Sequence, residues 1–297
     1  MLGPALGGPF VMVYLLALLS AAFYGAADFT GGFASRRAPM FSVVTISQLA
    51  GLLSLLPVLP LLGPASPIGA DYAWGAASGL AGGFGVGLLY RALAIGTMGV
   101  VAPTTSVCAV LIPVLASLLR GEELPALVLS GIALAVVAIM LLGQESAHPD
   151  HPAPRPPQYG LPSGMWHALA SGVAIGFFFL LLANARSEAG LWPLVAARVA
   201  GIPFFAGIVV ATGASFRLPR ELRWLVIGGG ALDMLANVLY LLATRYGSLA
   251  VAVTLVSLYP ASTVVLARVV LKERLSRLQV VGMIGALVAV VLIVQGG

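Results

Sequence analysis

The chain has 297 residues, of which 60% are hydrophobic and only 8% are charged, and this excludes a soluble fold because soluble domains carry roughly 25% charged residues. The net charge of +5 is spread over loops and helix ends, without the run of Lys or Arg that a nucleic-acid partner would need. Cys108 is the only cysteine, which excludes an intrachain disulfide and a cysteine-based metal cluster, and no feature of the sequence requires a cofactor.

Long apolar runs predict membrane-spanning helices. About 20 apolar residues cross the hydrocarbon core, and a spanning helix satisfies its own backbone hydrogen bonds. Five runs come first: Phe10–Phe33, Met40–Leu62, Tyr72–Ala94, Val100–Leu119 and Ala126–Gly143. Five more follow: Ser163–Ala185, Trp192–Thr212, Trp224–Thr244, Leu249–Val270 and Leu278–Val294. The predicted fold class is therefore all-α, a polytopic membrane protein with ten transmembrane helices.

A proline-rich stretch separates the two sets of runs. Residues 144–162 contain six prolines, which predict an extended, semi-rigid linker. We therefore expect a first five-helix repeat over residues 1–143, a linker over 144–162, and a second five-helix repeat over 163–297. His148 and His151 lie in this linker without further ligands, so we predict no metal site there.

The two halves of the chain repeat each other. The matching pairs, at an offset of 150 and then 151, are Trp74 and Trp224, Tyr90 and Tyr240, Glu122 and Glu273, Leu124 and Leu275, and Gly131 and Gly282. Because each half has an odd number of helices, the second half enters the membrane from the opposite side. Inverted repeats of this kind are typical of secondary transporters, with a substrate site near the midplane between the halves.

Two short signatures carry a resemblance to a known family. Gly121-Glu122-Glu123-Leu124 opens the fifth helix, and Lys272-Glu273-Arg274-Leu275 opens the tenth. Two five-helix repeats with these signatures resemble the EamA-type branch of the drug/metabolite transporter superfamily. The resemblance implies a carrier of small molecules, often an exporter of metabolites, amino acids or drugs, driven by an ion gradient.

The glutamates of these signatures, Glu122 and Glu273, have two interpretations. Each precedes a first helical turn, where free N–H groups and the helix dipole favour a carboxylate, so they can be helix-start signals. The neighbouring Arg120, Lys272 and Arg274 favour a gate or ion-pair role instead. The sequence leaves both open.

The eighth run carries polar side chains on one helical face. They are Asp233, Asn237, Tyr240 and Thr244, at spacings of 4, 3 and 4. An ionisable group at the bilayer centre costs at least about 2.5 kcal/mol, so this face is expected to meet a cavity or the partner repeat. We predict the substrate site here, with Tyr90, the mate of Tyr240, contributed by the first repeat.

Two more ionisable residues lie within apolar runs. Asp28 lies in the first run, and Arg198 lies in the seventh, where it can bind an anionic group or pair with a carboxylate. Asp28 and Asp233 are therefore candidates for substrate or proton coupling. The alternative is a structural Asp/Arg pair that fixes helix packing, with Arg91 and Arg245 as further cations within reach.

Small and hydroxyl-bearing residues complete the candidates. Gly75, Gly79, Gly83 and Gly87 fall at intervals of four in the third run and predict close helix packing. The hydroxyls either line the same cavity or bond back to their own helices: Thr104, Thr105, Ser106, Thr254 and Ser257. Four prolines are expected to kink or break their helices: Pro103, Pro113, Pro203 and Pro260.

Three classes of function fit a membrane protein of this kind. The first is a secondary transporter that moves a small metabolite or drug-like solute across the inner or plasma membrane by alternating access, with export the expected direction and protons the candidate coupling ion. The second is a channel or a non-transporting scaffold. The third, an intramembrane enzyme, needs partners within hydrogen-bond reach that no motif here provides, so we expect no enzyme activity.

The basic residues bear on orientation. One face would hold Arg36, Arg37, Arg155, Arg217, Arg220, Arg223, Lys272, Arg274 and Arg277, and the other Arg120, Arg186 and Arg245. The positive-inside rule places the first face in the cytoplasm and both termini outside. The family resemblance implies the opposite orientation, with both termini inside.

Overall fold

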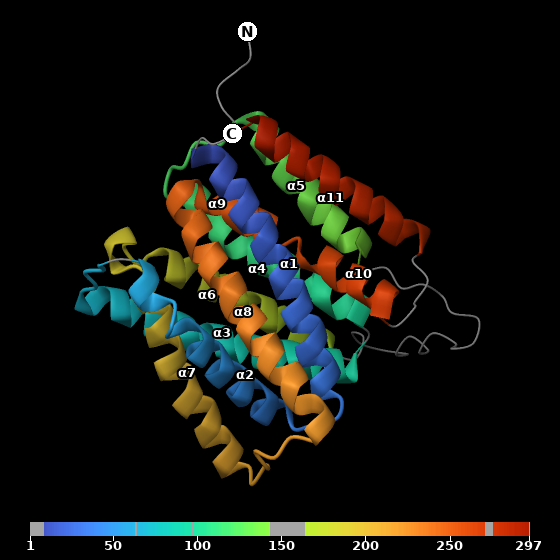
Figure 1. Cartoon of the computed structure of the whole chain (residues 1–297). Coiled ribbons are helices and arrows are strands. Elements are labelled where there is room, and N and C mark those ends of the chain that lie inside the picture. The colour runs from blue at the N-terminus through green and yellow to red at the C-terminus, as the bar shows by residue number, and fades with distance from the viewer. Residues whose placement is uncertain (1–8, 63, 97, 143–163, 271–275, 297) are drawn as a thin grey trace.

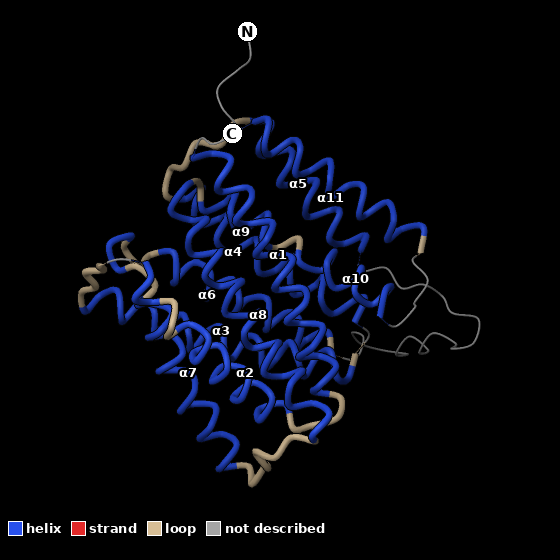
Figure 2. Tube along the Cα trace, in the orientation of Figure 1, coloured by secondary structure: helices blue, strands red, loops and turns tan. Residues whose placement is uncertain are grey.

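The computed structural model describes residues 9–62, 64–96, 98–142, 164–270 and 276–296 (Figure 1 and Figure 2). Every regular element in these ranges is helical. The α-helices are α1 (Pro9–Ser35), α2 (Met40–Leu55), α3 (Gly69–Ile95), α4 (Met98–Leu119), α5 (Ala126–Leu142), α6 (Met165–Ala183), α7 (Trp192–Ala211), α8 (Arg220–Tyr246), α9 (Leu249–Val256), α10 (Tyr259–Val270) and α11 (Arg277–Gly296). The predicted linker with His148 and His151, and the signature residue Glu273, lie outside the described residues.

Seven of these helices are long and apolar enough to cross a membrane. Three shorter apolar segments complete the ten predicted runs: Met40–Leu55, Ala126–Leu142 and Leu249–Thr263. The all-α membrane fold expected from the composition is confirmed.

Prolines account for the two clearest differences from the predicted runs. The run Met40–Leu62 forms α2 and then a short 3-10 helix, Leu59–Leu62, because Pro57 cannot donate the next helical bond. The run Leu249–Val270 is divided into α9 and α10 just before Pro260, as expected. The other three prolines do not break their helices, since α4 continues through Pro103 and Pro113 and α7 continues through Pro203.

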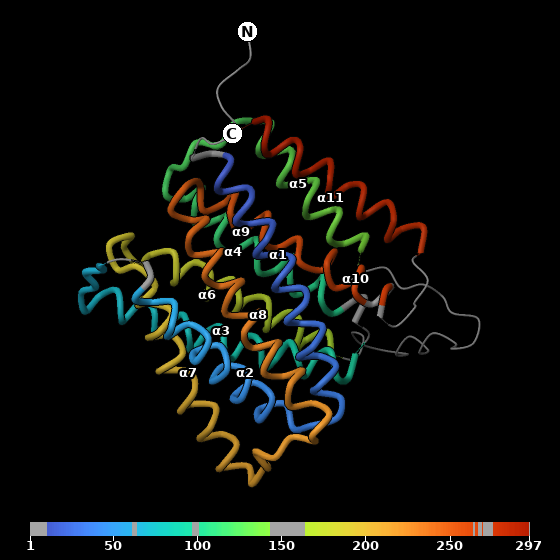
Figure 3. Tube along the Cα trace, viewed as in Figure 1, coloured from blue at the N-terminus to red at the C-terminus, as the bar shows by residue number. Residues whose placement is uncertain are grey.

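Each helix contact has a counterpart when the two repeats are exchanged. The contact of α1 with α8 corresponds to that of α6 with α3, and the contact of α2 with α8 corresponds to that of α7 with α3. The contact of α4 with α6 corresponds to the contacts of α1 with α9 and α10. The pair formed by α5 and α11 is its own mate, and it lies along one side of the molecule in Figure 3. The packing therefore has the pseudo-two-fold symmetry of inverted repeats.

Glycines set the closest of these contacts. A side chain at Gly75 or Gly79 would collide with the backbone of Pro193 or Ala197, so α3 and α7 are in direct contact there. Gly87, at the end of the same stripe, faces open space. The stripe is therefore a packing surface over only part of its length, as membrane helices use small residues to approach one another.

Candidate functional site

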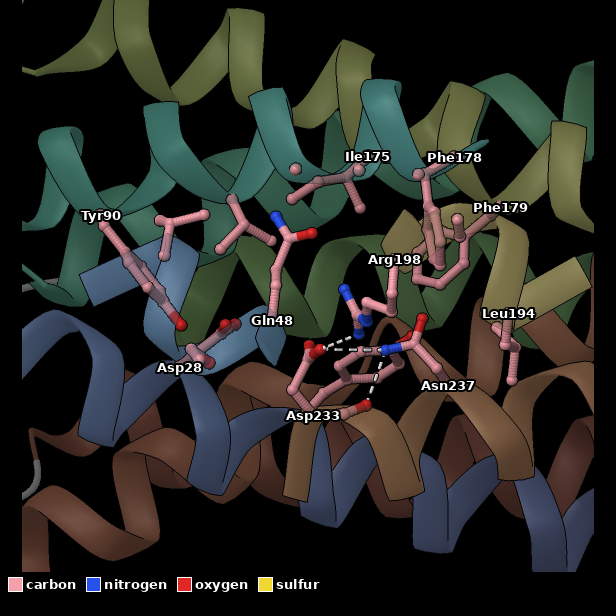
Figure 4. Close-up of a pocket in the computed structure, with 18 of the residues that line it drawn as sticks. Asp28, Gln48, Tyr90, Ile175, Phe178, Phe179, Leu194, Arg198, Asp233 and Asn237 are labelled. Atoms are coloured by element: carbon pink, nitrogen blue, oxygen red, sulfur yellow. Dashed lines mark hydrogen bonds and ion pairs between the residues drawn. The ribbon is translucent and has the colours of Figure 1, made fainter. Parts of the chain in front are cut away.

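A cavity lies between the two repeats at the centre of the molecule (Figure 4). Its lining side chains come from α1, α2 and α3 of the first repeat and from α6, α7, α8 and α10 of the second. Asp233 is thirteen residues from each end of α8, which places the cavity at the middle of the helix bundle. This is where inverted-repeat proteins hold a ligand.

Five of the predicted site residues line this cavity: Asp28, Tyr90, Arg198, Asp233 and Asn237. The first two come from the first repeat and the others from the second. The fold therefore brings together predicted site residues that are up to 209 positions apart in the chain, since 237 − 28 = 209.

An ion pair occupies the centre of the cavity (Figure 4). Nη2 of Arg198 donates to Oδ2 of Asp233 at 2.5 Å, and the two side chains are 12% and 20% exposed. Nδ2 of Asn237 donates to the Asp233 carbonyl at 2.6 Å and to Oδ2 at 3.2 Å. A carboxylate and a guanidinium withdrawn from water need such mutual bonds, so α7 and α8 are fixed to each other here.

Asp28 provides a second carboxylate that is not compensated in this way. It is 9% exposed, it lies near Tyr90 at one end of the cavity, and it forms no ion pair with any described residue. The other two cations considered for it lie elsewhere. Arg91 is exposed, and Arg245 donates to the carbonyl of Gly190 at 2.5 Å. The described cavity wall thus carries two carboxylates and one guanidinium.

The repeat explains why the charges fall where they do. At an offset of 150, Arg198 corresponds to Gln48 and Asp233 corresponds to Gly83. Gln48 lies against Gly83, so close that a side chain on this glycine would meet Nε2 of Gln48. The same contact therefore exists in both repeats, and only the second repeat makes it an ion pair.

The end of the cavity opposite Asp28 is aromatic. Phe178 is the repeat mate of Asp28, since 178 − 28 = 150, and it lies beside Phe179 with ring centroids 5.3 Å apart (Figure 4). Leu194 completes this end. The cavity thus has an acidic end and an apolar end, separated by the Arg198–Asp233 pair.

Three buried polar atoms on the cavity wall have no hydrogen-bond partner among the described residues. They are the hydroxyl of Tyr24, Oε1 of Gln48 and Nε of Arg198. Buried polar groups are nearly always hydrogen-bonded, so these atoms are the ones a polar ligand would satisfy. Gln48 and Tyr259 were not predicted as wall residues, although Gln48 lies at the offset of 150 from Arg198.

Tyr240 and Thr244, which we predicted for the site, do not line the cavity. Tyr240 is fully buried, and its hydroxyl donates to the carbonyl of Phe179 at 2.6 Å. The Thr244 hydroxyl donates to the carbonyl of Leu241 in its own helix at 2.8 Å. The polar face of α8 is therefore divided, and its last two turns serve helix packing.

Two alternatives were open for five hydroxyl-bearing residues, and none of the five lines this cavity: Thr104, Thr105, Ser106, Thr254 and Ser257. The Thr105 hydroxyl donates to the carbonyl of Ala168 at 3.1 Å, and the Ser106 hydroxyl donates to the carbonyl of Ser257. Thr254 donates to the carbonyl of Ala250 in its own helix at 2.7 Å. These groups connect or bend helices instead of contacting the cavity.

Glu122 lies in the loop between α4 and α5, four residues before Ala126. Its carboxylate accepts a hydrogen bond from the hydroxyl of Ser117 in α4. It therefore joins the loop to the preceding helix, and the two interpretations of Glu122, a helix-start signal and a gate or ion-pair residue, stay predictions. Glu273, its repeat mate, lies outside the described residues.

Comparisons with known proteins match the whole architecture. The profile of the EamA-like transporter family matches residues 11–144 and again residues 162–295. No curated protein matches the chain. A solved structure described only as the crystal structure of a protein superposes with a TM-score of 0.69 over 94% of this chain and 95% of that one, at 14% identity, and so shares the fold.

Proposed function

Because the chain belongs to the EamA-like transporter family, we propose that it is a secondary active transporter that moves a small solute across the plasma or inner membrane by alternating access. The observation that carries this proposal is the central cavity, whose charged residues come from both inverted repeats. In such an architecture, rocking of one repeat against the other exposes a central site to each side in turn. Export is the proposed direction, following the resemblance to drug/metabolite transporters.

The two ends of the cavity favour an amphipathic solute. Phe178, Phe179 and Leu194 provide an apolar surface for a hydrocarbon or ring portion. The Arg198–Asp233 pair and Asp28 provide charge at the middle and at the other end. A small solute with one apolar part and one polar, hydrogen-bonding or cationic part matches this distribution.

Asp28 is the proposed coupling residue. It carries the carboxylate that no described cation compensates, and an ionised group buried without a partner is unfavourable. A proton or the cationic part of a solute relieves the same unfavourable charge. We therefore propose that the two compete for Asp28, so that proton entry accompanies solute exit.

Counterflow in proteoliposomes tests the proposal, with a panel of small amphipathic solutes. We expect accumulation of labelled solute against its gradient, and net export that depends on an inward pH gradient. Asp28→Asn should abolish the dependence on the pH gradient, because the amide takes up no proton. Exchange of solute for solute should also weaken in this variant, because the amide offers no charge to the cationic part of the solute.

The alternative class remains distinguishable in the same assay. Solute movement that never exceeds equilibrium would indicate a channel. Coupled transport by Asp28→Asn at the original rate would remove Asp28 from the mechanism. Glu123→Gln serves as the control, because Glu123 is an exposed loop carboxylate that does not line the cavity.

A further inference from the structure

The ends of the helices form two faces with different loops. The Arg186 face contains the loop between α2 and α3 and the loop between α6 and α7, which holds Arg186. The Arg36 face contains the loop between α1 and α2, which holds Arg36, and the loop between α7 and α8. The loop after the first helix lies on the Arg36 face in the first repeat and on the Arg186 face in the second. Exchanging the two repeats therefore exchanges the two faces.

The two repeats are tied together on the Arg186 face. Nη2 and Nε of Arg186 donate to Oδ2 of Asp71 at 2.9 and 3.2 Å, and the Arg186 backbone N–H donates to Oδ1 at 3.0 Å. Asp71, in the first turn of α3, is 1% exposed. Beside it, the N–H of Ser66 donates to the carbonyl of Glu188 at 2.8 Å.

Each partner of this contact has a repeat mate on the Arg36 face. At the offset of 150, Asp71 corresponds to Glu221 and Arg186 corresponds to Arg36. Glu221 is an acidic residue in the first turn of α8, as Asp71 is in the first turn of α3. Both the charges and their positions on the helices are therefore preserved.

The mates are not paired with each other in this structure. Arg36 and Glu221 are both described and both exposed, and no ion pair joins them. The backbone bond between Ser66 and Glu188 also has no equivalent, because none joins Phe216 to Ala38.

One bond between the repeats does lie near the Arg36 face. The Ser42 hydroxyl donates to the carbonyl of Ser215 at 2.9 Å. It joins the start of α2 to the loop between α7 and α8, at positions that do not correspond to the acid–arginine pair. The difference between the two faces thus lies in the acid–arginine pair, which is formed by Asp71 and Arg186 and not by Glu221 and Arg36.

We infer that the Asp71–Arg186 and Arg36–Glu221 pairs are two gate locks that form alternately, one on each face of the transporter. This inference rests on the proposed alternating access and assigns to it four residues outside the central cavity. The present structure is closed and locked on the Arg186 face. Rocking to the opposite state separates Asp71 from Arg186 and brings Arg36 to Glu221 by the same pseudo-two-fold operation.

The chemistry of the two pairs suits this exchange. Each lock joins one repeat to the other, because Asp71 and Arg36 belong to the first repeat while Arg186 and Glu221 belong to the second. Each is at a face, where a separated arginine and carboxylate are rehydrated, so neither state leaves a charge stranded in the membrane. The energies of the two locks oppose each other, which keeps both states populated.

Disulfide formation reports which face is closed, in a Cys108→Ser background that removes the native thiol. Ser66→Cys with Glu188→Cys reports the Arg186 face, and the repeat mates Ala38→Cys with Phe216→Cys report the Arg36 face. A disulfide requires Cβ atoms about 3.5–4.5 Å apart, so each pair forms only when its face is closed. We expect the first reporter to dominate in the otherwise native protein.

Neutralising one lock should shift the reporters in opposite directions. Asp71→Asn keeps the helix-capping acceptor and should raise the ratio of Arg36-face to Arg186-face crosslinks by up to about fivefold, the scale of a partly exposed ion pair. Glu221→Gln should lower the same ratio. Arg186→Gln should raise the crosslink ratio as Asp71→Asn does. Glu123→Gln, which changes an exposed acid on the Arg186 face, should leave the ratio unchanged.

Two results would overturn the inference. The first is an unchanged ratio in both Asp71→Asn and Arg186→Gln. The second is a fall of both crosslinks together, which indicates a loosened fold and no exchange between states. The assay contains no solute, so it separates the two proposals: crosslinks that exchange without counterflow reject transport, and counterflow with unchanged crosslinks rejects the locks.

Discussion

At the scale of single residues, the cavity derives its chemistry from positions where the repeats differ. Asp28 faces the site from one repeat while its mate Phe178 does so from the other. Arg198 likewise replaces Gln48, its mate. A symmetric cavity would present the same surface to both sides of the membrane. The differences give it an acidic end and an apolar end.

We predict that Asp233→Asn abolishes gradient-driven transport and lowers stability. The variant leaves the guanidinium of Arg198, only 12% exposed, without its anionic partner. Loss of a hydrogen bond to a charged group costs about 1.5–3 kcal/mol. Thermal unfolding in detergent measures the loss of stability, and counterflow measures the loss of transport.

The double variant Asp233→Asn with Arg198→Gln is the matched comparison. It removes both charges and places at position 198 the glutamine that Gln48 already provides in the first repeat. Stability should recover while transport stays lost. A double variant as unstable as the single one would show that the stranded guanidinium is not the cause.

The polar spacing of the eighth run located Asp233 and Asn237, because an intramembrane carboxylate has to face away from lipid. The same spacing failed for Tyr240, whose hydroxyl finds the Phe179 carbonyl in a neighbouring helix. A sequence shows which face of a helix is polar, but it does not show where along that face the cavity ends and packing begins.

At the scale of helices, the apolar runs gave reliable positions because length and hydropathy are set by the bilayer. Their interruptions were harder to predict. Pro260 divides a predicted helix, whereas Pro103 lies inside α4 without breaking it. The outcome depends on whether neighbouring groups satisfy the backbone carbonyl that loses its donor, and that depends on tertiary structure.

The glycine stripe of α3 supports a prediction at this scale. Gly79→Ala should lower the free energy of unfolding by about 1–3 kcal/mol, because its methyl group would collide with the Ala197 backbone and force α7 away. Gly87→Ala, in the same helix and stripe, faces open space and should leave stability unchanged or slightly higher. Thermal unfolding of the two variants, measured side by side, checks the difference. Equal shifts would mean that the contact with α7 is not limiting.

At the scale of the whole molecule, the repeat is visible in packing as well as in sequence. Gly131 in α5 lies against Ala289 of α11, and Gly282 in α11 lies against Ala138 of α5. These two contacts are mates at an offset of 151, the slip that the sequence showed near its signatures. The symmetry therefore extends from the central cavity to the peripheral pair of helices.

The distribution of basic residues leads to a prediction about orientation. The described part of the Arg36 face includes Arg36, Arg37 and Arg217, and the positive-inside rule places that face in the cytoplasm. The face locked by Asp71 and Arg186 is then external, and the cavity in this structure belongs to a state closed to the outside.

A phosphatase that is active only outside the cytoplasm, fused after Gly297, should be active. The same enzyme inserted after Gly213, in the loop between α7 and α8, should be silent. Activity at Gly213 with silence at Gly297 would reverse the assignment and make the locked face cytoplasmic.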